Sequence, residues 1–175
     1  MQASDQGTRG GGKHLAVPRT LIFLTSTNPA TGADEVLLLK GAATKRLWAG
    51  KFNGIGGHVE ADEDVHAAAV RELREETGLA VDALTLRGVV HIDTGRDEQG
   101  PRPGVMMFVF IGRAPARSVH ATSEGAPAWI PMEKIADHAL VDDLYALLPR
   151  ALASGPLFYG HYAPDDQGRM HYHFA

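Results

Sequence analysis

Three glutamates, Glu72, Glu75 and Glu76, lie within one short stretch of the chain. In an α-helix with ~3.6 residues per turn they fall within roughly 100° of one another on one face. Carboxylates at this spacing repel one another, and each such pair slightly destabilises a helix. Their oxygens are also the ligands that Mg2+ and Mn2+ prefer. The spacing therefore indicates either a solvated acidic helix face or a site for a divalent metal ion.

The residues around these glutamates predict a helix that can present them to a cleft. Helix-forming residues run from 65 to 77, and Gly78 is a typical C-terminal stop. Ala69 and Leu73 are spaced i,i+4 and belong to an apolar stripe separate from the glutamates. We expect this stripe to pack on a sheet while the acidic face stays accessible.

The segment before the helix favours the metal site over the solvated face. Gly54, Gly56 and Gly57 permit positive φ angles and let a ligand approach the backbone closely. Asp62 or Asp64 is a candidate N-cap, and acidic residues at this helix end also suit its dipole.

Apolar runs elsewhere predict a mixed sheet with two main helices, in the α/β or α+β class. The predicted strands lie at residues 20–25, 35–40, 105–111, 128–130, 158–162 and 170–174, with hairpins between the first two and the last two. A second helix is predicted at 140–153, where Pro149 can kink or end it, and a loop at 94–104. We expect one domain over residues 15–175 after a flexible Gly-rich tail at 1–14.

Length and composition limit the classes of function. The chain has 175 residues, 44% of them hydrophobic, a net charge of −4 and no cysteine. The lack of cysteine excludes disulfides, thiolate metal sites and a cysteine nucleophile, and the acidic balance argues against binding duplex nucleic acid. No apolar run approaches the ~18 residues of a membrane span, and no signal-peptide pattern is present. We expect a cytoplasmic protein without a membrane partner, and the oligomeric state stays open.

Residues 57–79 resemble the Nudix box at every position that defines it. The pattern reads Gly57, five residues, Glu63, seven residues, Arg71-Glu72-Leu73, one residue, Glu75-Glu76, one residue, Gly78-Leu79. Agreement at so many fixed positions is far more specific than a short glycine motif. The resemblance implies the Nudix fold, a mixed β-sheet sandwiched by helices, with the box as loop–helix–loop.

The resemblance also implies a reaction. Nudix hydrolases cleave nucleoside diphosphates linked to another group, with a divalent metal that is usually Mg2+ and that Mn2+ can replace. The three glutamates match metal ligands of the family, with Glu76 as the one whose loss should be most harmful, and the backbone carbonyl of Gly56 matches a further ligand. Glu63 and Arg71 match a pair that braces the loop against the helix.

Two residues outside the box are further candidates. Glu124 lies in a loop just before the predicted strand that contains Trp129, where MutT-type members of the family carry a metal-binding or base glutamate. The alternative is a solvated loop acid. Lys40 is a candidate phosphate contact. Bound metal would neutralise phosphate oxygens and lower the pKa of a water, whose proton a glutamate could accept.

Residues 51–59 resemble the segment before the box in MutT-type hydrolases of oxidised purine nucleoside triphosphates. In that group an asparagine at the position of Asn53 and an aspartate pair, matched by Asp142 and Asp143, contact the purine. An amide and a carboxylate together offer the donors and acceptors that a guanine-like edge requires. The alternatives are a turn role for Asn53 and stabilisation of a helix N-terminus by the aspartates.

The resemblance thus implies a nucleotide substrate such as 8-oxo-dGTP, and other readings stay open. ADP-ribose, dinucleoside polyphosphates and capped RNA are alternative substrates, and a non-catalytic Nudix-fold binding module is an alternative class. Leu140 or Val141 stands where that group has a tryptophan, so any base-stacking residue must lie elsewhere. The candidates are Trp48, Phe52, Phe23 and Phe110, with core packing as the favoured alternative for the last two.

Overall fold

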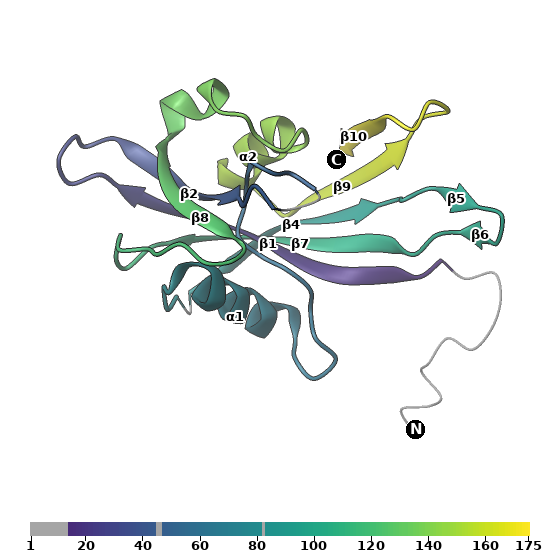
Figure 1. Ribbon diagram of the computed structural model, residues 1–175, viewed down its shortest axis with the longest axis horizontal. Helices are drawn as coiled ribbons and strands as arrows, with labels where there is room; N and C mark the ends of the chain where they lie inside the picture. The colour runs from purple at the N-terminus through teal and green to yellow at the C-terminus, as the bar shows by residue number, and fades with distance from the viewer. Residues whose placement is uncertain (1–13, 45–46, 82) are drawn as a thin grey trace.

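The computed structural model describes residues 14–44, 47–81 and 83–175. The flexible tail predicted at 1–14 falls almost entirely outside the described residues. Figure 1 shows a large curved sheet with helices against it. Its strands are β1 (Ala16–Thr27), β2 (Asp34–Gly41), β3 (Phe52–Asn53), β4 (Thr85–Ile92), β7 (Gly104–Arg113), β8 (Gly125–Pro131), β9 (Phe158–Pro164) and β10 (Met170–Phe174).

The sheet is mixed, which confirms the predicted fold class. Its order is β10-β9-β4-β7-β1-β2-β3, with β8 paired to β2. β1 is parallel to β7 and antiparallel to β2, while β4 is antiparallel to β7 and parallel to β9. Both predicted hairpins, β1 with β2 and β9 with β10, are present.

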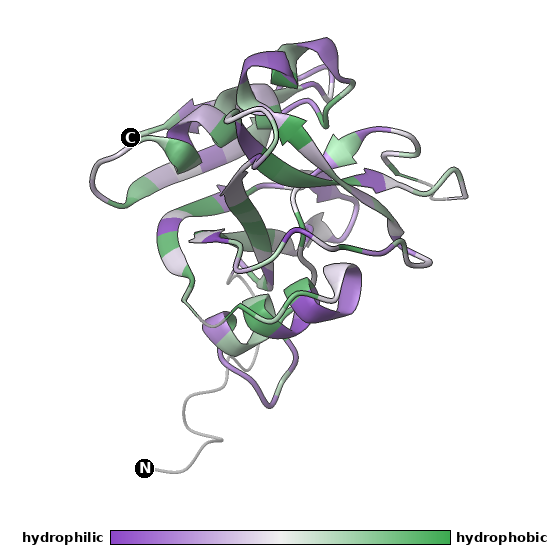
Figure 2. Cartoon of the chain, turned by 90° about the vertical axis from the view of Figure 1, so that its left-hand side faces the viewer, coloured by the Kyte–Doolittle hydropathy of each residue, from purple (hydrophilic) through white to green (hydrophobic). Residues whose placement is uncertain are grey.

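Alternating side chains of β1 face two separate hydrophobic cores. Leu21 and Phe23 belong to the core that includes α2 (Leu144–Leu152), and Ile22 and Leu24 belong to the core that includes α1 (Val65–Thr77). Because successive strand residues point to opposite sides, α1 and α2 cover opposite faces of the sheet, as Figure 1 shows. In Figure 2 the central strands are mostly hydrophobic, whereas α1 is banded with both colours, as expected for an amphipathic helix.

Helix α1 begins and ends as its sequence predicts. The Asp64 carboxylate accepts hydrogen bonds from the backbone N–H groups of His66 and Ala67, at 2.8 and 2.9 Å. Asp64, rather than Asp62, is therefore the N-cap. Gly78 adopts a left-handed conformation with φ of 78°, and its N–H bonds to the Arg74 carbonyl, which terminates the helix.

Several elements differ from the sequence-based expectation. Helix α2 starts at Leu144 instead of 140, because the backbone of Val141 and Ala139 pairs with Phe52 at 2.9 and 2.8 Å and is therefore extended. Pro149 lies inside this helix. A 3-10 helix, η2 (Met132–Asp137), was not predicted, and the predicted loop at 94–104 contains a small hairpin of β5 (Arg96–Asp97) and β6 (Gly100–Pro101). No helix in the described part of the chain is long and apolar enough to cross a membrane.

Candidate active site

A cavity of about 1070 Å³ opens where the box meets the sheet. Its walls come from segments far apart in the sequence: β1, β2, residues 47–58, α1, β4, β7, residues 122–124, residues 141–143, β9 and β10. Gly56, Glu72, Glu75 and Glu76 all line it, and we call these four residues the glutamate group. The helix face predicted from the sequence therefore does face a cleft.

Arg71 connects the loop before α1 to the helix itself. Its Nε and Nη2 donate to the two carboxylate oxygens of Glu63, at 3.0 and 2.6 Å, and Nη2 also donates to the His58 carbonyl at 3.0 Å. The hydrogen bonds from Arg71, and then from the Glu60 backbone N–H, hold the pKa of Glu63 below its ordinary value. This forked pair joins the two halves of the box, as the resemblance implied, and its bracing role stays a prediction.

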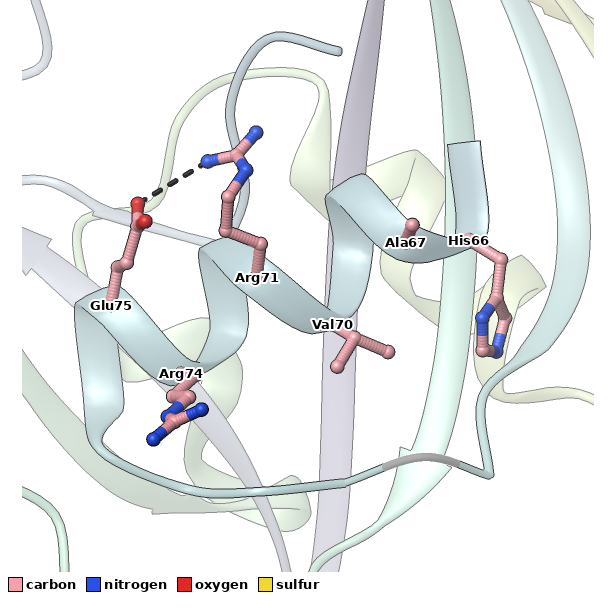
Figure 3. Close-up of a pocket in the computed structure, with 6 residues that line it drawn as sticks. All are labelled: His66, Ala67, Val70, Arg71, Arg74 and Glu75. Atoms are coloured by element: carbon pink, nitrogen blue, oxygen red, sulfur yellow. Dashed lines mark hydrogen bonds and ion pairs between the residues drawn. The ribbon is translucent and has the colours of Figure 1, made fainter. Parts of the chain in front are cut away.

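The same guanidinium holds two members of the glutamate group. Arg71 Nη1 lies 2.9 Å from Glu72 Oε1 and 3.2 Å from Glu75 Oε2. Figure 3 shows the second contact, on a shallow depression of about 800 Å³ outside α1 that Glu75 borders together with His66, Val70 and Arg74. Glu75 thus stands at the rim between this outer depression and the main cavity.

Glu76 is the most buried member of the glutamate group, with 6% of its surface exposed. Its Oε2 accepts a hydrogen bond from the Gly56 N–H at 3.0 Å. Gly56 has φ of 144°, and a Cβ added there would lie 2.3 Å from the Thr20 carbonyl oxygen. Only glycine fits this position, and it brings the loop backbone against the helix carboxylate.

The glutamate group fits a divalent cation in the type of its donors. Its three glutamates offer hard carboxylate oxygens, which Mg2+ and Mn2+ prefer. Within the described residues, however, no three or more such side chains are already arranged to hold a metal ion. Arg71 holds Glu72 and Glu75, and the Gly56 N–H holds Glu76. A bound cation would therefore compete with Arg71 for two of the carboxylates.

Glu124 also lines the cavity, from the loop that leads into β8. Its backbone carbonyl accepts a hydrogen bond from the Ala42 N–H at 3.2 Å, and its own N–H donates to Thr122 Oγ1 at 3.2 Å. These contacts fix the loop beside the end of β2. The structure therefore brings Glu124 and Glu76 to one cavity, as the sequence predicted.

Lys40 is not among the residues that line the cavity. Its Nζ lies 5.8 Å from the centre of the Phe52 ring instead. Among the described residues, the lysine and arginine that line the cavity are Lys51 and Arg19. The sequence reasoning missed Arg19, because the first strand was predicted to begin one residue after it, whereas β1 begins at Ala16.

Four other residues from separate parts of the chain line the same cavity, and we call them the tyrosine group: Asn53, Asp143, Tyr162 and Tyr172. Asn53 accepts a hydrogen bond from the Gly54 N–H at 2.8 Å, so its side chain does have the turn contact considered above. The two tyrosines lie opposite each other on β9 and β10, with ring centres 4.7 Å apart. Neither tyrosine was predicted as a site residue. The available signals were the alternation of the last hairpin and a resemblance of residues 158–162 to the tail strand of MutT-type hydrolases.

The two adjacent aspartates differ in environment. Asp142 is exposed and pairs with Lys51 Nζ at 2.7 Å. Asp143 precedes α2 without a side-chain capping hydrogen bond, and burial raises the pKa of its carboxyl group. Both line the cavity, and Asp143 is the less exposed of the two.

Comparison with known proteins agrees with this site. The NUDIX domain family matches residues 18–151. The chain is 31% identical over 142 residues to the oxidized purine nucleoside triphosphate hydrolase of Mus musculus, a match that covers 74% of this chain and 80% of that protein. It is 34% identical over 110 residues to the protein of the same name from Danio rerio, covering 56% of this chain and 60% of that one.

A crystal structure of a MutT protein from Bacillus halodurans shares the fold, with a TM-score of 0.73 at 21% identity over 90% of this chain and 97% of that one. The chain therefore belongs to the NUDIX domain family. It is a Nudix hydrolase, a class that generally uses divalent metal ions and binds nucleotide substrates.

Proposed function

We propose that this protein is a Mg2+-dependent pyrophosphohydrolase that cleaves a nucleoside triphosphate to the monophosphate and pyrophosphate. The preferred substrate is a purine deoxynucleotide, oxidised as in 8-oxo-dGTP. One observation carries the proposal: the glutamate group and the tyrosine group line one cavity. A nucleotide has two matching parts, an anionic phosphate chain and a planar base. The names of the mouse and zebrafish relatives support this substrate class.

The glutamate group would hold the metal through its carboxylates and the Gly56 carbonyl, with Glu124 as a further ligand. When bound, Mg2+ or Mn2+ neutralises phosphate oxygens and lowers the pKa of water. Arg71 and Glu63 would position these donors by joining loop to helix. Arg19 and Lys51 supply positive charge in the cavity wall, which favours a polyphosphate.

Two carboxylates are candidates to accept the proton of the attacking water. Glu76 is buried beside the Gly56 N–H, and Glu124 stands on an exposed loop across the cavity wall. General bases act through direct contact with the proton that they remove. Both carboxylates line the cavity in which the phosphate chain would bind, so both are retained as candidates.

Asn53 and Asp143 would read the base. An amide offers a donor and an acceptor, and an ionised carboxylate offers acceptors, which together suit a guanine-like edge. Because Lys51 already holds Asp142 at the surface, we assign base recognition to Asp143. Lys40 does not line the cavity, so we assign contact with the phosphates to Arg19 and Lys51 instead.

A substrate screen with product identification tests the proposal. Purified protein is incubated with Mg2+ or Mn2+ and with 8-oxo-dGTP, dGTP, dATP, pyrimidine triphosphates, ADP-ribose, a dinucleoside polyphosphate and capped RNA. We expect monophosphate and pyrophosphate, with the highest kcat/KM for 8-oxo-dGTP. Faster turnover of ADP-ribose, the dinucleoside or the cap would contradict the substrate, and no turnover of any compound would favour the non-catalytic binding module.

A further inference from the structure

Tyr162 combines deep burial with an unused polar group. Only 2% of its surface is exposed, yet it lines the cavity from β9. Its hydroxyl is inaccessible and has no hydrogen-bond partner of acceptable geometry. A buried hydroxyl without a partner destabilises a fold, so its position in this wall requires an explanation.

The ring of Tyr162 is held firmly in place. Its centre lies 4.7 Å from that of Tyr172 and 5.7 Å from that of Phe174, with the rings edge to face in both pairs. The strand around it is paired on both sides, to β4 and to β10. The hydroxyl therefore cannot swing away to find a partner, and any partner must come to it.

Asp143 is the acceptor beside this hydroxyl. The hydroxyl makes no well-formed hydrogen bond, but the Asp143 carboxylate is close enough to interact with it. Burial, then the negative charge of Asp143 and the hydrogen-bonding contact with it, raise the pKa of Tyr162, which stays a neutral donor at physiological pH. The Asp143 side chain makes no capping hydrogen bond to α2. The charged or titratable groups around the pair are Asp142, Lys51, Tyr172 and Arg150.

We propose that Tyr162 is the positioning residue for Asp143: its hydroxyl donates a hydrogen bond to the Asp143 carboxylate when a purine is bound, and so holds that carboxylate as an acceptor for N–H groups of the base. This inference rests on the proposed function. A bond from a fixed neutral donor favours the ionised form of a buried carboxylate. Tyr162 would thereby favour guanine-type bases, which present N–H donors, over adenine-type bases.

The test compares Tyr162→Phe with Tyr159→Phe, which makes the same change on the same strand at a side chain that is 60% exposed. Binding of GMP, 8-oxo-dGMP and AMP is measured by calorimetry from about pH 6 to about pH 8.5, without metal or turnover. For Tyr162→Phe we expect GMP and 8-oxo-dGMP affinity to fall about 3–10-fold at the low end of this pH range, and the loss should shrink as rising pH ionises more of Asp143. AMP affinity should not fall, and Tyr159→Phe should match wild type.

Thermal unfolding separates this role from a structural one. Removal of a hydroxyl that has no partner in the unliganded protein should leave Tm unchanged or higher. A lower Tm with an unchanged pH profile of purine binding would show that the hydroxyl only supports the fold, and would overturn the inference. An equal loss for all three nucleotides at every pH would also overturn it.

Failure of the inference and failure of the proposed function give different results. If wild-type protein binds guanine-type nucleotides and Tyr162→Phe binds them equally well at every pH, the inference alone is wrong. If wild-type protein binds none of the three nucleotides, the purine substrate and the inference are both wrong.

Discussion

The glutamate group and the tyrosine group line the same cavity but are built in different ways. The glutamate group comes from one continuous segment, residues 56–76, and each of its carboxylates is held by Arg71 or by a backbone N–H. The tyrosine group comes from β3, the start of α2, β9 and β10. It contains a buried hydroxyl without a partner and a carboxyl group whose pKa burial has raised.

This difference separates two tasks. A network held by local hydrogen bonds keeps several like charges in a fixed place, which suits a reaction step that must be the same for every substrate. Buried polar groups that lack some of their hydrogen bonds bind most tightly to a ligand that supplies the missing bonds. Such groups are suited to discriminate between bases. Substitutions in the first group should therefore lower kcat, and substitutions in the second should change KM and base preference.

The largest effect is expected for Glu76→Gln. The substitution keeps the size of the side chain and an oxygen that can accept from Gly56, but removes a charge from the centre of the glutamate group. We expect kcat to fall roughly 10²–10⁴-fold for every substrate, the usual effect of losing a catalytic acid or base. Steady-state kinetics measure this, with the exposed Glu98→Gln as the control. A change confined to KM would place Glu76 outside the reaction step.

Arg71→Lys should have the next largest effect. Lysine keeps the charge but cannot make the forked contact with Glu63 while also reaching Glu72 and Glu75. We expect activity to fall about 10–100-fold, as for other residues that orient metal ligands, with a lower Tm. Arg74→Lys, an exposed arginine on the same helix, is the matched control. Equal effects of the two variants would mean that helix charge matters and the bracing contacts do not.

The glutamate group was predictable because its geometry is local. Helical periodicity places Glu72, Glu75 and Glu76 on one face without any knowledge of the rest of the chain. Capping by Asp64 and termination at Gly78 follow from residue type. The resemblance predicted the pairing of Arg71 with Glu63. The sequence did not reveal that the same guanidinium also contacts the His58 carbonyl, because that contact depends on how the loop folds back.

The tyrosine group was predictable only in part, since it depends on long-range pairing. Asn53 and Asp143 were found through resemblance, whereas Tyr162 faces the cavity because β9 pairs in parallel with β4. A parallel register between strands so distant in sequence leaves no local signal. The predicted start of α2 was wrong for the same reason. The backbone of residues 139 and 141 pairs with Phe52, and helix propensity does not reveal this long-range contact.

Asp143→Asn should show the pH dependence that sets the tyrosine group apart. Burial raises the pKa of this carboxyl above its ordinary value of 3.8, so the folded chain keeps a proton that the unfolded chain releases. Stability from this group is full below the unfolded pKa and is lost as pH rises through the folded pKa. At about pH 7.5 we therefore expect Asp143→Asn, which removes the titrating group, to raise Tm above that of wild type.

Unfolding curves of the same variant near pH 4.5 provide the control, because the gain should shrink there as wild type becomes protonated. The variant should also raise KM for guanine-type triphosphates while kcat changes little. A Tm gain that is independent of pH would mean that burial of the Asp143 carboxylate is not the cause.

The smallest effect is expected for Asp142→Asn, the same substitution one residue earlier. Asp142 is exposed and its partner Lys51 is partly exposed, and ion pairs of this kind contribute little because water and salt screen them. We expect Tm to stay near wild type at every pH and KM to change by about twofold or less. If Asp142→Asn instead weakened purine binding more than Asp143→Asn, the recognising carboxylate would be the exposed one. Burial and the Tyr162 hydroxyl would then have no part in base discrimination, and the distinction between the two groups would rest on the glutamates alone.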